Sequence, residues 1–494
     1  MPAFNLVRRG AYHDSVTLMR LSRDMEAVAG VTRAAAMMGT PHNLALLRDA
    51  GLLTAEGDGA GPSDLVVAVV ADREDAARAA WAAAEAALAR ASRGGGSVMP
   101  SVGGVARRRS LRTAMAELSD ANLALISVPG VYAAAEAAKA LAAGLHVMVF
   151  SDNVPVADEV RLKHVARARG LFGLGPDCGT AILGGVPLGF ANAVPRGRIG
   201  LAAASGTGLQ AVTCHLAAAG EGVSHAIGLG GRDLSDEVGG LMLEPALAAL
   251  AADPATEVIC VICKPPGPIT AKKIDGWLAA LDKPWVAHFT GGAATGTSSA
   301  TLEDVAHAAV ALARGETHRP TEFTVGDGDV ARLVADTAAS LKAGRRLVRG
   351  VYAGGTLAQE AASLLPAQAG HRVVDLGDDV YTVGRPHPMI DGTLRREWIV
   401  READDPTTAV ILLDVVLGHG AHPDPAGELL PAIERARRQG VAVVASVCGT
   451  EGDPQGLSGQ VAVLRRAGVI VMPSNAQAAR LAKLIAVRAA GGHA

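Results

Sequence analysis

Residues 198–240, RIGLAAASGTGLQAVTCHLAAAGEGVSHAIGLGGRDLSDEVGG, decide the fold of this chain. The apolar run Ile199–Ala204 predicts a buried strand. A glycine-rich turn, Ser205-Gly206-Thr207-Gly208, follows it, and residues 209–219 then carry apolar side chains at helical spacing. Such a turn leaves backbone N–H groups unpaired at the positive end of the helix dipole. We therefore expect it to bind a phosphate or carboxylate, with simple helix capping as the alternative.

A second strand and a second glycine turn complete the same stretch. The apolar run His225–Leu229 ends in Gly230 and Gly231, and Arg232 and Asp233 come next. The carboxyl ends of neighbouring parallel strands meet at one edge of a sheet, so both turns are expected to line one crevice. Arg232 and Asp233 are expected either to contact a substrate there or to form a local salt bridge.

The composition indicates a large α/β protein. The 494 residues suffice for about three or four domains. Hydrophobic residues make up 49% of the chain and charged residues 19%, which provides ample material for buried cores. The net charge of −3 argues against nucleic acid or an anionic membrane as the main partner. No apolar run reaches the length of a membrane span, and we expect a cytoplasmic protein.

Two of the five cysteines, Cys260 and Cys263, form a C-x-x-C pattern inside the predicted strand VICVIC. Positions i and i+3 of a strand point to opposite faces, so the two thiols are not expected to converge on one metal ion. We interpret them as core residues and predict no metal site.

The order of apolar runs and amphipathic segments predicts several α/β domains. In the first domain, Ser15–Leu21 is expected to be a strand and Ser22–Ala29 a helix, while Thr40-Pro41 is expected to start a helix. The predicted parts are a small N-terminal α/β domain (1–92), a linker (93–109), a Rossmann-like domain (110–195), an α/β domain (196–316), a linker and helix (317–344) and a last α/β domain (345–494).

The last domain repeats the pattern of the 196–316 domain. Strand 347–352 leads into Ala353-Gly354-Gly355-Thr356 and a helix, and strand 373–376 leads into Gly377-Asp378-Asp379. The two pairs of glycine turns indicate a divergent internal duplication. Asp378 and Asp379 are expected to bind a cation, to orient backbone amides, or to cap a helix.

Several long motifs carry a family resemblance over nearly the whole chain. They are MMGTPHN (37–43), SDNVPVADEV (151–160), GPDCGT (175–180), ASGTG (204–208), HAIGLGGRDLSDEVGG (225–240), DLGDDVYTVGRPHPMID (375–391) and LLDVVLGHGA (412–421). With them the chain resembles the FdrA proteins of the succinyl-CoA synthetase superfamily. The resemblance implies a Rossmann-like domain of the CoA-binding type, followed by two flavodoxin-like ligase domains.

FdrA proteins are commonly labelled acyl-CoA synthetases. The resemblance also implies one subunit of an oxamate carbamoyltransferase of allantoin and purine catabolism, built with two other proteins. On that basis we expect an oligomeric enzyme whose substrate is carbamoyl phosphate, with no certain cofactor. The alternatives are an acyl-CoA synthetase that needs a partner, CoA and ATP or ADP, and a non-catalytic scaffold subunit.

The chain departs from the synthetases at three points. They phosphorylate a histidine in a G-H-A-G segment, but the corresponding stretch here, TGGAATGTSSA (290–300), contains no histidine. The G-x-T-G-x-x-G loop that holds CoA is missing, and so is an ATP-grasp domain. These departures favour transfer of a carbamoyl group without a phosphohistidine.

The predicted site combines the two glycine turns with side chains from neighbouring loops. We expect the helix N-termini at Ser205–Gly208 and Gly354–Thr356 to face each other and to bind the phosphate of carbamoyl phosphate. Arg385 is expected to bind the carboxylate of oxamate. His387 is expected to be a general base or a structural hydrogen-bond donor. Asn153 and Asp177, at strand ends of the Rossmann-like domain, are further candidate substrate contacts.

Overall fold

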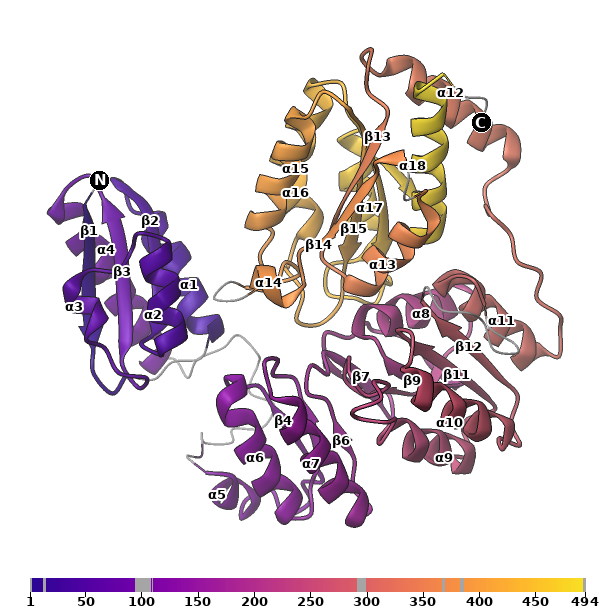
Figure 1. The fold of residues 1–494 in the computed structure, drawn as a ribbon, viewed down its shortest axis with the longest axis horizontal. Helices are drawn as coiled ribbons and strands as arrows, with labels where there is room; N and C mark the ends of the chain where they lie inside the picture. Colours follow the sequence, from indigo (N-terminus) through magenta and orange to yellow (C-terminus); the bar gives the residue numbers. More distant parts are fainter. Residues whose placement is uncertain are drawn as a thin grey trace. The chain divides into compact units, whose positions relative to one another are not determined.

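The computed structural model describes residues 2–11, 15–93, 108, 110–290, 299–366, 369–382 and 386–491. The chain divides into two compact units (Figure 1). The first comprises Met1–Arg109 and Val380–Pro386, and the second comprises Ser110–Asp379 and His387–Ala494. Arg385 and most of the predicted linker 93–109 lie outside the described residues. Among the described residues, no helix has both the length and the apolar character that crossing a membrane requires.

The first unit is built on a three-stranded antiparallel sheet of order β1-β3-β2. Its elements are β1 (Ala3–Arg8), α1 (Ser15–Glu26), β2 (Val31–Met38), α2 (Pro41–Asp49), α3 (Ala55–Asp58), β3 (Leu65–Ala71) and α4 (Glu74–Arg93). The central strand β3 is buried along its whole length. Val67 and Val69 pack with α1 and α4, whereas Val66 and Ala68 pack with α2 and the loop after it. Both faces of the sheet are therefore covered.

The prediction of a strand at Ser15–Leu21 is wrong, because these residues begin helix α1. Leu18, Leu21 and Met25 are buried, and their spacing of three and four residues places them on one helical face. The expected start of α2 is confirmed: the side chain of Thr40 accepts a hydrogen bond from the backbone N–H of Asn43 at 3.2 Å. Strand β1 was not predicted.

The second unit begins with a three-stranded parallel sheet of order β4-β5-β6. Its elements are α5 (Leu111–Met115), β4 (Leu123–Ile126), α6 (Gly130–Ala142), β5 (His146–Val149), α7 (Val156–Ala168) and β6 (Gly173–Leu174). Ala137 and Leu141 of α6 pack with Val147 and Val149 of β5. The Rossmann-like alternation of parallel strands and helices expected here is confirmed.

A six-stranded mixed sheet follows, with the order β12-β11-β9-β10-β7-β8. Its elements are β7 (Thr180–Leu183), β8 (Val186–Gly189), β9 (Arg196–Ala204), α8 (Gly206–Ala218), β10 (Val223–Gly228), α9 (Leu243–Ala252), β11 (Val258–Cys263), α10 (Pro268–Ala279), β12 (Trp285–Phe289) and α11 (Leu302–Arg314). Strands β9 to β12 are parallel, and the β7–β8 hairpin joins them antiparallel to β10. The boundary expected at residue 195 therefore separates strands of a single sheet.

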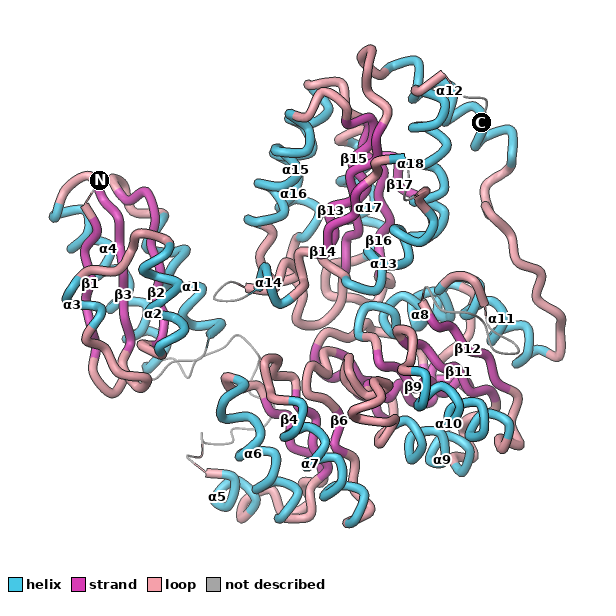
Figure 2. Tube along the Cα trace, in the orientation of Figure 1, coloured by secondary structure: helices cyan, strands magenta, loops and turns pink. Residues whose placement is uncertain are grey.

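Helices cover both faces of this sheet (Figures 1 and 2). Helices α8 and α11 pack on one face and α9 and α10 on the other. Cys260 belongs to the first of these cores and Cys263 to the second, and both thiols are buried and free. The prediction that the C-x-x-C side chains point to opposite faces is confirmed.

The last sheet has five parallel strands in the order β14-β13-β15-β16-β17. Its elements are α12 (Asp327–Ser340), β13 (Leu347–Tyr352), α13 (Gly355–Leu364), β14 (Arg372–Asp375), α14 (Asp379–Thr382), α15 (Thr393–Asp404), β15 (Thr408–Val416), α16 (Pro425–Arg438), β16 (Ala442–Cys448), α17 (Leu457–Arg466), β17 (Ile470–Met472) and α18 (Asn475–Ala489). Numbered along the chain, its strands have the order 2-1-3-4-5, and β10-β9-β11-β12 have the order 2-1-3-4. This shared flavodoxin-like order supports the internal duplication.

One hydrophobic core runs through both repeats. It includes residues of β9, β11, α8 and α11 from the first repeat and of β13, β15, α13 and α18 from the second. Helices α8 and α13 are thus packed in a common interior, and each begins at the carboxyl end of the first strand of its repeat. This arrangement brings the two predicted anion-binding turns together.

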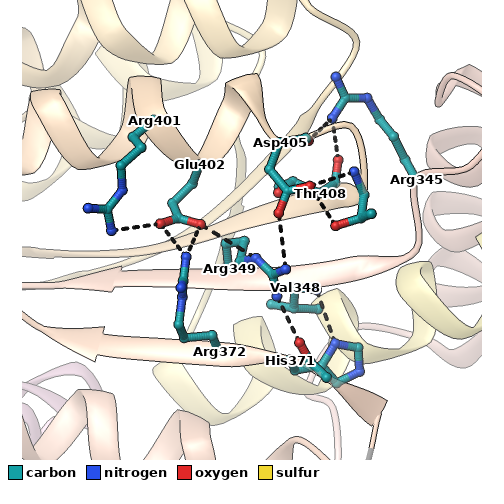
Figure 3. A network of polar contacts seen from close by, with 11 residues as sticks. Arg345, Val348, Arg349, His371, Arg372, Arg401, Glu402, Asp405 and Thr408 are labelled. Atoms are coloured by element: carbon teal, nitrogen blue, oxygen red, sulfur yellow. Dashed lines mark hydrogen bonds and ion pairs between the residues drawn. The ribbon is translucent and has the colours of Figure 1, made fainter.

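An arginine network stabilises the last sheet near its amino edge (Figure 3). The buried carboxylate of Glu402 accepts hydrogen bonds from Arg372 at 2.6 Å and from Arg401 at 3.2 Å, and it pairs with Arg349 at 3.4 Å. Arg349 also pairs with Asp405 at 3.2 Å. These arginines are engaged with protein acceptors, so we interpret the network as structural.

Candidate functional site

The first turns of α8 and α13 are joined by direct hydrogen bonds. Ser205 caps α8 by accepting the N–H of Gly208 at 3.1 Å, and its Oγ lies 2.6 Å from Oγ1 of Thr356. The backbone N–H of Thr356 donates to Oγ1 of Thr207 at 3.3 Å. The two helix N-termini therefore face each other, as the sequence predicted, and their binding role stays a prediction.

Glycine allows this close approach. A Cβ atom on Gly354 would lie 3.0 Å from Cγ2 of Thr207, and one on Gly208 would lie 3.2 Å from Cγ2 of Thr356. A larger residue at either position would have to push the two helices apart.

Part of the predicted anion site is already occupied by protein atoms. The carboxylate of Asp414 accepts the backbone N–H groups of Ala353 at 2.9 Å and Gly354 at 2.7 Å, and Arg395 donates to it at 2.9 Å. The expectation that Gly354 offers its N–H to an anion is therefore corrected: Asp414, from β15, takes the place of the ligand. Sequence reasoning missed Asp414 because it lies 60 positions away.

Three backbone donors remain at the junction. In the part of the chain that the structure describes, the N–H groups of Gly206, Thr207 and Gly355 donate to no protein acceptor. Each belongs to the first turn of its helix, where the helix itself supplies no partner. Together with the one hydroxyl proton that the Ser205–Thr356 hydrogen bond leaves free, they make a small set of donors suited to an anion.

Asp375 lies at the edge of these donors. It ends strand β14, and its Oδ1 accepts the N–H of Gly377 at 2.9 Å. A Cβ atom on Gly355 would lie 2.5 Å from its Oδ2, which places this oxygen over the first residue of α13. The pKa of Asp375 is raised to about 6, chiefly by burial; the Gly377 hydrogen bond opposes this rise, and the negative charge of Asp414 contributes to it. A carboxyl with this pKa at a set of free donors is a candidate functional group.

Lys264 is a second residue that the sequence analysis did not single out. It follows β11 directly, is exposed, and its positive charge lowers the pKa of Asp375. The signal that could have identified it is its place in the turn KPPG, at the end of the third parallel strand of the repeat.

His387 is held as a neutral ring. Its Nδ1 accepts the N–H of Met389 at 3.2 Å, and its ring centroid lies 5.7 Å from that of Phe190. Burial, aided by the positive charge of Arg395, lowers the pKa of His387 to about 4. A base with this pKa is weak at neutral pH, and the ring accepts this hydrogen bond where a donor was predicted, so His387 has a structural role as an acceptor.

Gly230 and Gly231 of the second predicted glycine turn lie against the 175–177 turn. Gly230 has a φ of 89°, and a Cβ atom there would lie 2.4 Å from the carbonyl oxygen of Pro176. A Cβ atom on Gly231 would lie 3.0 Å from Oδ2 of Asp177. Asp177 (φ 54°) and Asn153 (φ 53°) are both left-handed and exposed. The second glycine turn is therefore packed against the 175–177 turn, and Gly230 is needed for that contact.

Arg232 and Asp233 form salt bridges. Asp233 is fully buried and pairs with Lys163 at 2.7 Å, and Lys163 also pairs with Glu159 at 2.8 Å. Arg232 pairs with Glu159 at 3.0 Å. Asp233 further accepts the N–H of Leu243 at 3.0 Å. Of the two predicted roles, the structure shows the salt bridge, which ties α7 to the loop after β10.

Asp378 is exposed and precedes the short helix α14, and Asp379 is the first residue of that helix. Among the described residues, no group of three or more histidine, cysteine or acidic side chains is arranged to hold a metal ion.

Comparisons with known proteins match both ends of the chain. Residues 351–485 match the CoA-ligase family model, and residues 1–100 match the model of the AllF heavy metal-associated domain. An uncharacterized Escherichia coli K12 protein, YahF, is 36% identical, covering 97% of each chain. The mitochondrial succinate–CoA ligase [ADP-forming] subunit alpha-2 of Trichomonas vaginalis is 32% identical, over 36% of this chain and 58% of that protein. A solved dinucleotide-forming acetyl-coenzyme A synthetase 1 of Ca. Korarchaeum cryptofilum covers 75% of this chain and 84% of its own, at 16% identity and a TM-score of 0.30.

The N-terminal match raises the question of a heavy metal. Residues 1–100 contain no cysteine, since the first cysteine of the chain is Cys178. Soft metal ions select thiolate ligands, and among the described residues of this domain no three histidine, cysteine or acidic side chains are grouped to hold a metal ion. The residues present do not fit a heavy-metal site.

Proposed function

Because this chain belongs to the FdrA family of succinyl-CoA synthetase-like proteins, we propose that it binds an acyl phosphate where α8 meets α13. The proposed reaction moves a carbamoyl group between carbamoyl phosphate and oxamate, with oxalurate and inorganic phosphate as products. It belongs to allantoin degradation and takes place in a complex with two other subunits. The observation that carries this proposal is the 2.6 Å contact between Ser205 and Thr356, which joins two helix N-termini at one point.

The free donors suit this chemistry. Displacement at a carbamoyl carbon requires stabilisation of the charge on the leaving phosphate and of the oxygen of the tetrahedral intermediate. The N–H groups of Gly206, Thr207 and Gly355 are fixed by their helices, so they need no reorganisation when charge develops. Lys264 adds a positive charge near the same edge.

The reaction needs no covalent nucleophile. A ligase of the succinyl-CoA synthetase type passes a phosphoryl group through a histidine, and residues 290–300 contain none. Direct transfer between two bound substrates requires positioning and electrostatic stabilisation, besides a group that takes up the proton of the attacking nitrogen. The free donors of the junction serve the first two purposes.

The second candidate is an acyl-CoA ligase. It is favoured by the match of residues 351–485 to the CoA-ligase model and by the similarity to a succinate–CoA ligase subunit. It would need CoA, ATP or ADP, and a partner that supplies the phosphoryl carrier.

The test is a pair of assays on the complex isolated through a tag on this chain. We expect phosphate release from carbamoyl phosphate that depends on oxamate, and no thioester formation from CoA, succinate and ATP. Thioester formation without carbamoyl transfer would replace the proposal with the ligase. Binding of carbamoyl phosphate with neither activity would identify a scaffold subunit.

A further inference from the structure

Two carboxylates lie at the start of α13, and they differ in their hydrogen bonds. Asp414 is fully buried and accepts two backbone N–H groups and one bond from Arg395. Asp375 accepts a single backbone N–H, from Gly377, through Oδ1. Within the described residues, its Oδ2 accepts no hydrogen bond and lies over Gly355. Both oxygens of Asp414 therefore accept hydrogen bonds from the protein, whereas Oδ2 of Asp375 remains for contact with a ligand.

From this difference we propose that Asp375 is a catalytic residue that exchanges a proton with the amide nitrogen of the substrate. This inference rests on the proposed carbamoyl transfer. Gly355 offers one of the three free backbone donors, so an anion bound there lies beside Oδ2 of Asp375. The carboxylate is thus placed next to the atoms that react.

The proton balance of the reaction requires such a group. In the direction of oxalurate formation, the oxamate nitrogen attacks the carbamoyl carbon and a C–N bond forms. The C–O bond to phosphate breaks, its electron pair leaves with the phosphate, and the proton released from nitrogen passes to Asp375. In the reverse direction, a phosphate oxygen attacks the carbamoyl carbon, the C–N bond breaks, and Asp375 returns the proton to the leaving nitrogen.

The electrostatic surroundings of Asp375 suit both directions. Its pKa of about 6 leaves both protonation states accessible near neutral pH. Burial is the main cause, Asp414 and Asp378 raise the pKa further, and Lys264 opposes them. The nearby His387, whose pKa is lowered to about 4, stays neutral over the same pH range. Asp375 is therefore the group expected to titrate at this site between pH 5 and 7.

Binding of sulfate tests the placement without any turnover. Sulfate does not titrate near neutral pH, so any proton taken up on binding comes from the protein. An anion beside Asp375 raises the pKa of that carboxyl, so the wild-type complex should bind sulfate about tenfold more tightly at pH 5 than at pH 7.5, since one pKa unit corresponds to a factor of ten. Calorimetry in two buffers of different ionisation enthalpy should show the proton uptake.

Asp375→Asn should remove this linkage. The variant keeps an oxygen for the Gly377 N–H but cannot ionise, so it should bind sulfate at pH 7.5 as tightly as the wild type does at pH 5. Asp282→Asn, an exposed aspartate before β12, is the matched control and should behave as the wild type. Equal pH dependence in wild type and Asp375→Asn would overturn the inference and leave the anion site standing. No sulfate binding by either would reject the junction as an anion site, and with it the proposed function.

Turnover tests the catalytic role itself. Asp375→Asn should lower kcat for oxamate-dependent phosphate release by about 10²–10⁴-fold without raising KM for carbamoyl phosphate, because loss of the carboxylate charge favours binding of the anion. Asp375→Glu should restore part of kcat. A wild-type complex that turns over while Asp375→Asn keeps more than a tenth of its rate would overturn the inference but not the proposed function. Proton-linked sulfate binding in a complex without carbamoyl transfer would refute the proposed function and the catalytic role together.

Discussion

Oγ of Ser205 lies 2.6 Å from Oγ1 of Thr356, although the two residues are 151 positions apart in the sequence. Both belong to the turn that follows the first strand of a repeat, so the internal duplication brings like ends of two helices together. Backbone N–H groups at the two helix N-termini find their hydrogen-bond acceptors in different ways. Ser205 caps its own helix, whereas Gly354 has no side chain to do so and Asp414 accepts its N–H instead. The junction is therefore asymmetric.

The hydroxyl pair should be measurably coupled. We expect Ser205→Ala and Thr356→Val to show a coupling energy of about 1 kcal/mol in a double-mutant cycle, because each substitution removes the same buried hydrogen bond. Urea-induced unfolding followed by tryptophan fluorescence measures it. Strictly additive effects would mean that the two hydroxyls do not interact in solution.

Lys163 should be essential for the stability of the second unit. Its side chain is 1% exposed and pairs with Glu159 and Asp233, so Lys163→Met leaves the buried Asp233 without its cation and leaves Glu159 with Arg232 alone. We expect the free energy of unfolding to fall by about 3–5 kcal/mol. Lys139→Met, which removes an exposed pair with Glu136 on α6, should cost less than about 1 kcal/mol. Similar losses in the two variants would contradict the buried network.

Most of the fold followed from local patterns in the sequence. Apolar runs such as Val258–Cys263, each closed by a glycine or proline turn, predict parallel strands because both faces of such strands are buried. The prediction of a strand at Ser15–Leu21 was wrong because the segment considered was too short. The helical spacing of the buried Leu18, Leu21 and Met25 becomes clear only when residues after Leu21 are included. The hairpin of β7 and β8 belongs to the same sheet as β9 to β12 and is joined to β10 through the antiparallel pair Ile182 and Ala226, which no local signal predicts.

The site was only partly predictable. Glycine turns after strands can be read from the sequence, and Ser205 and Thr207 were found in this way. The roles of Gly354 and Asp375 depend on which carboxylate the fold brings to the start of α13, and that is a tertiary property. Arg232 and Asp233 resemble substrate-binding residues in sequence, but the buried Lys163 engages Asp233, and Arg232 pairs with Glu159.

Asp375 should reduce stability at neutral pH. Its pKa is raised from 3.8 to about 6, so the folded chain holds the proton more tightly than the unfolded chain, and stability falls as pH rises through that window. At pH 7 the ionised carboxylate costs about 2–3 kcal/mol, which Asp375→Asn should recover. At pH 4, close to the pKa of 3.8 in the unfolded chain, most of this cost is lost and the difference should fall below about 1 kcal/mol. Urea unfolding at pH 4 and pH 7 provides the comparison, and a difference independent of pH would contradict the raised pKa.

The most direct test of the central claim compares two threonines on the same helix. Thr207 accepts the N–H of Thr356 at the junction, whereas the hydroxyl of Thr213 donates to the carbonyl oxygen of Gln210 within α8. In the isolated complex, Thr207→Val should lower kcat/KM for oxamate-dependent phosphate release from carbamoyl phosphate by about 10²-fold or more. Thr213→Val should stay within about threefold of the wild type. Equal rates for the two variants would place the chemistry away from the junction of α8 and α13.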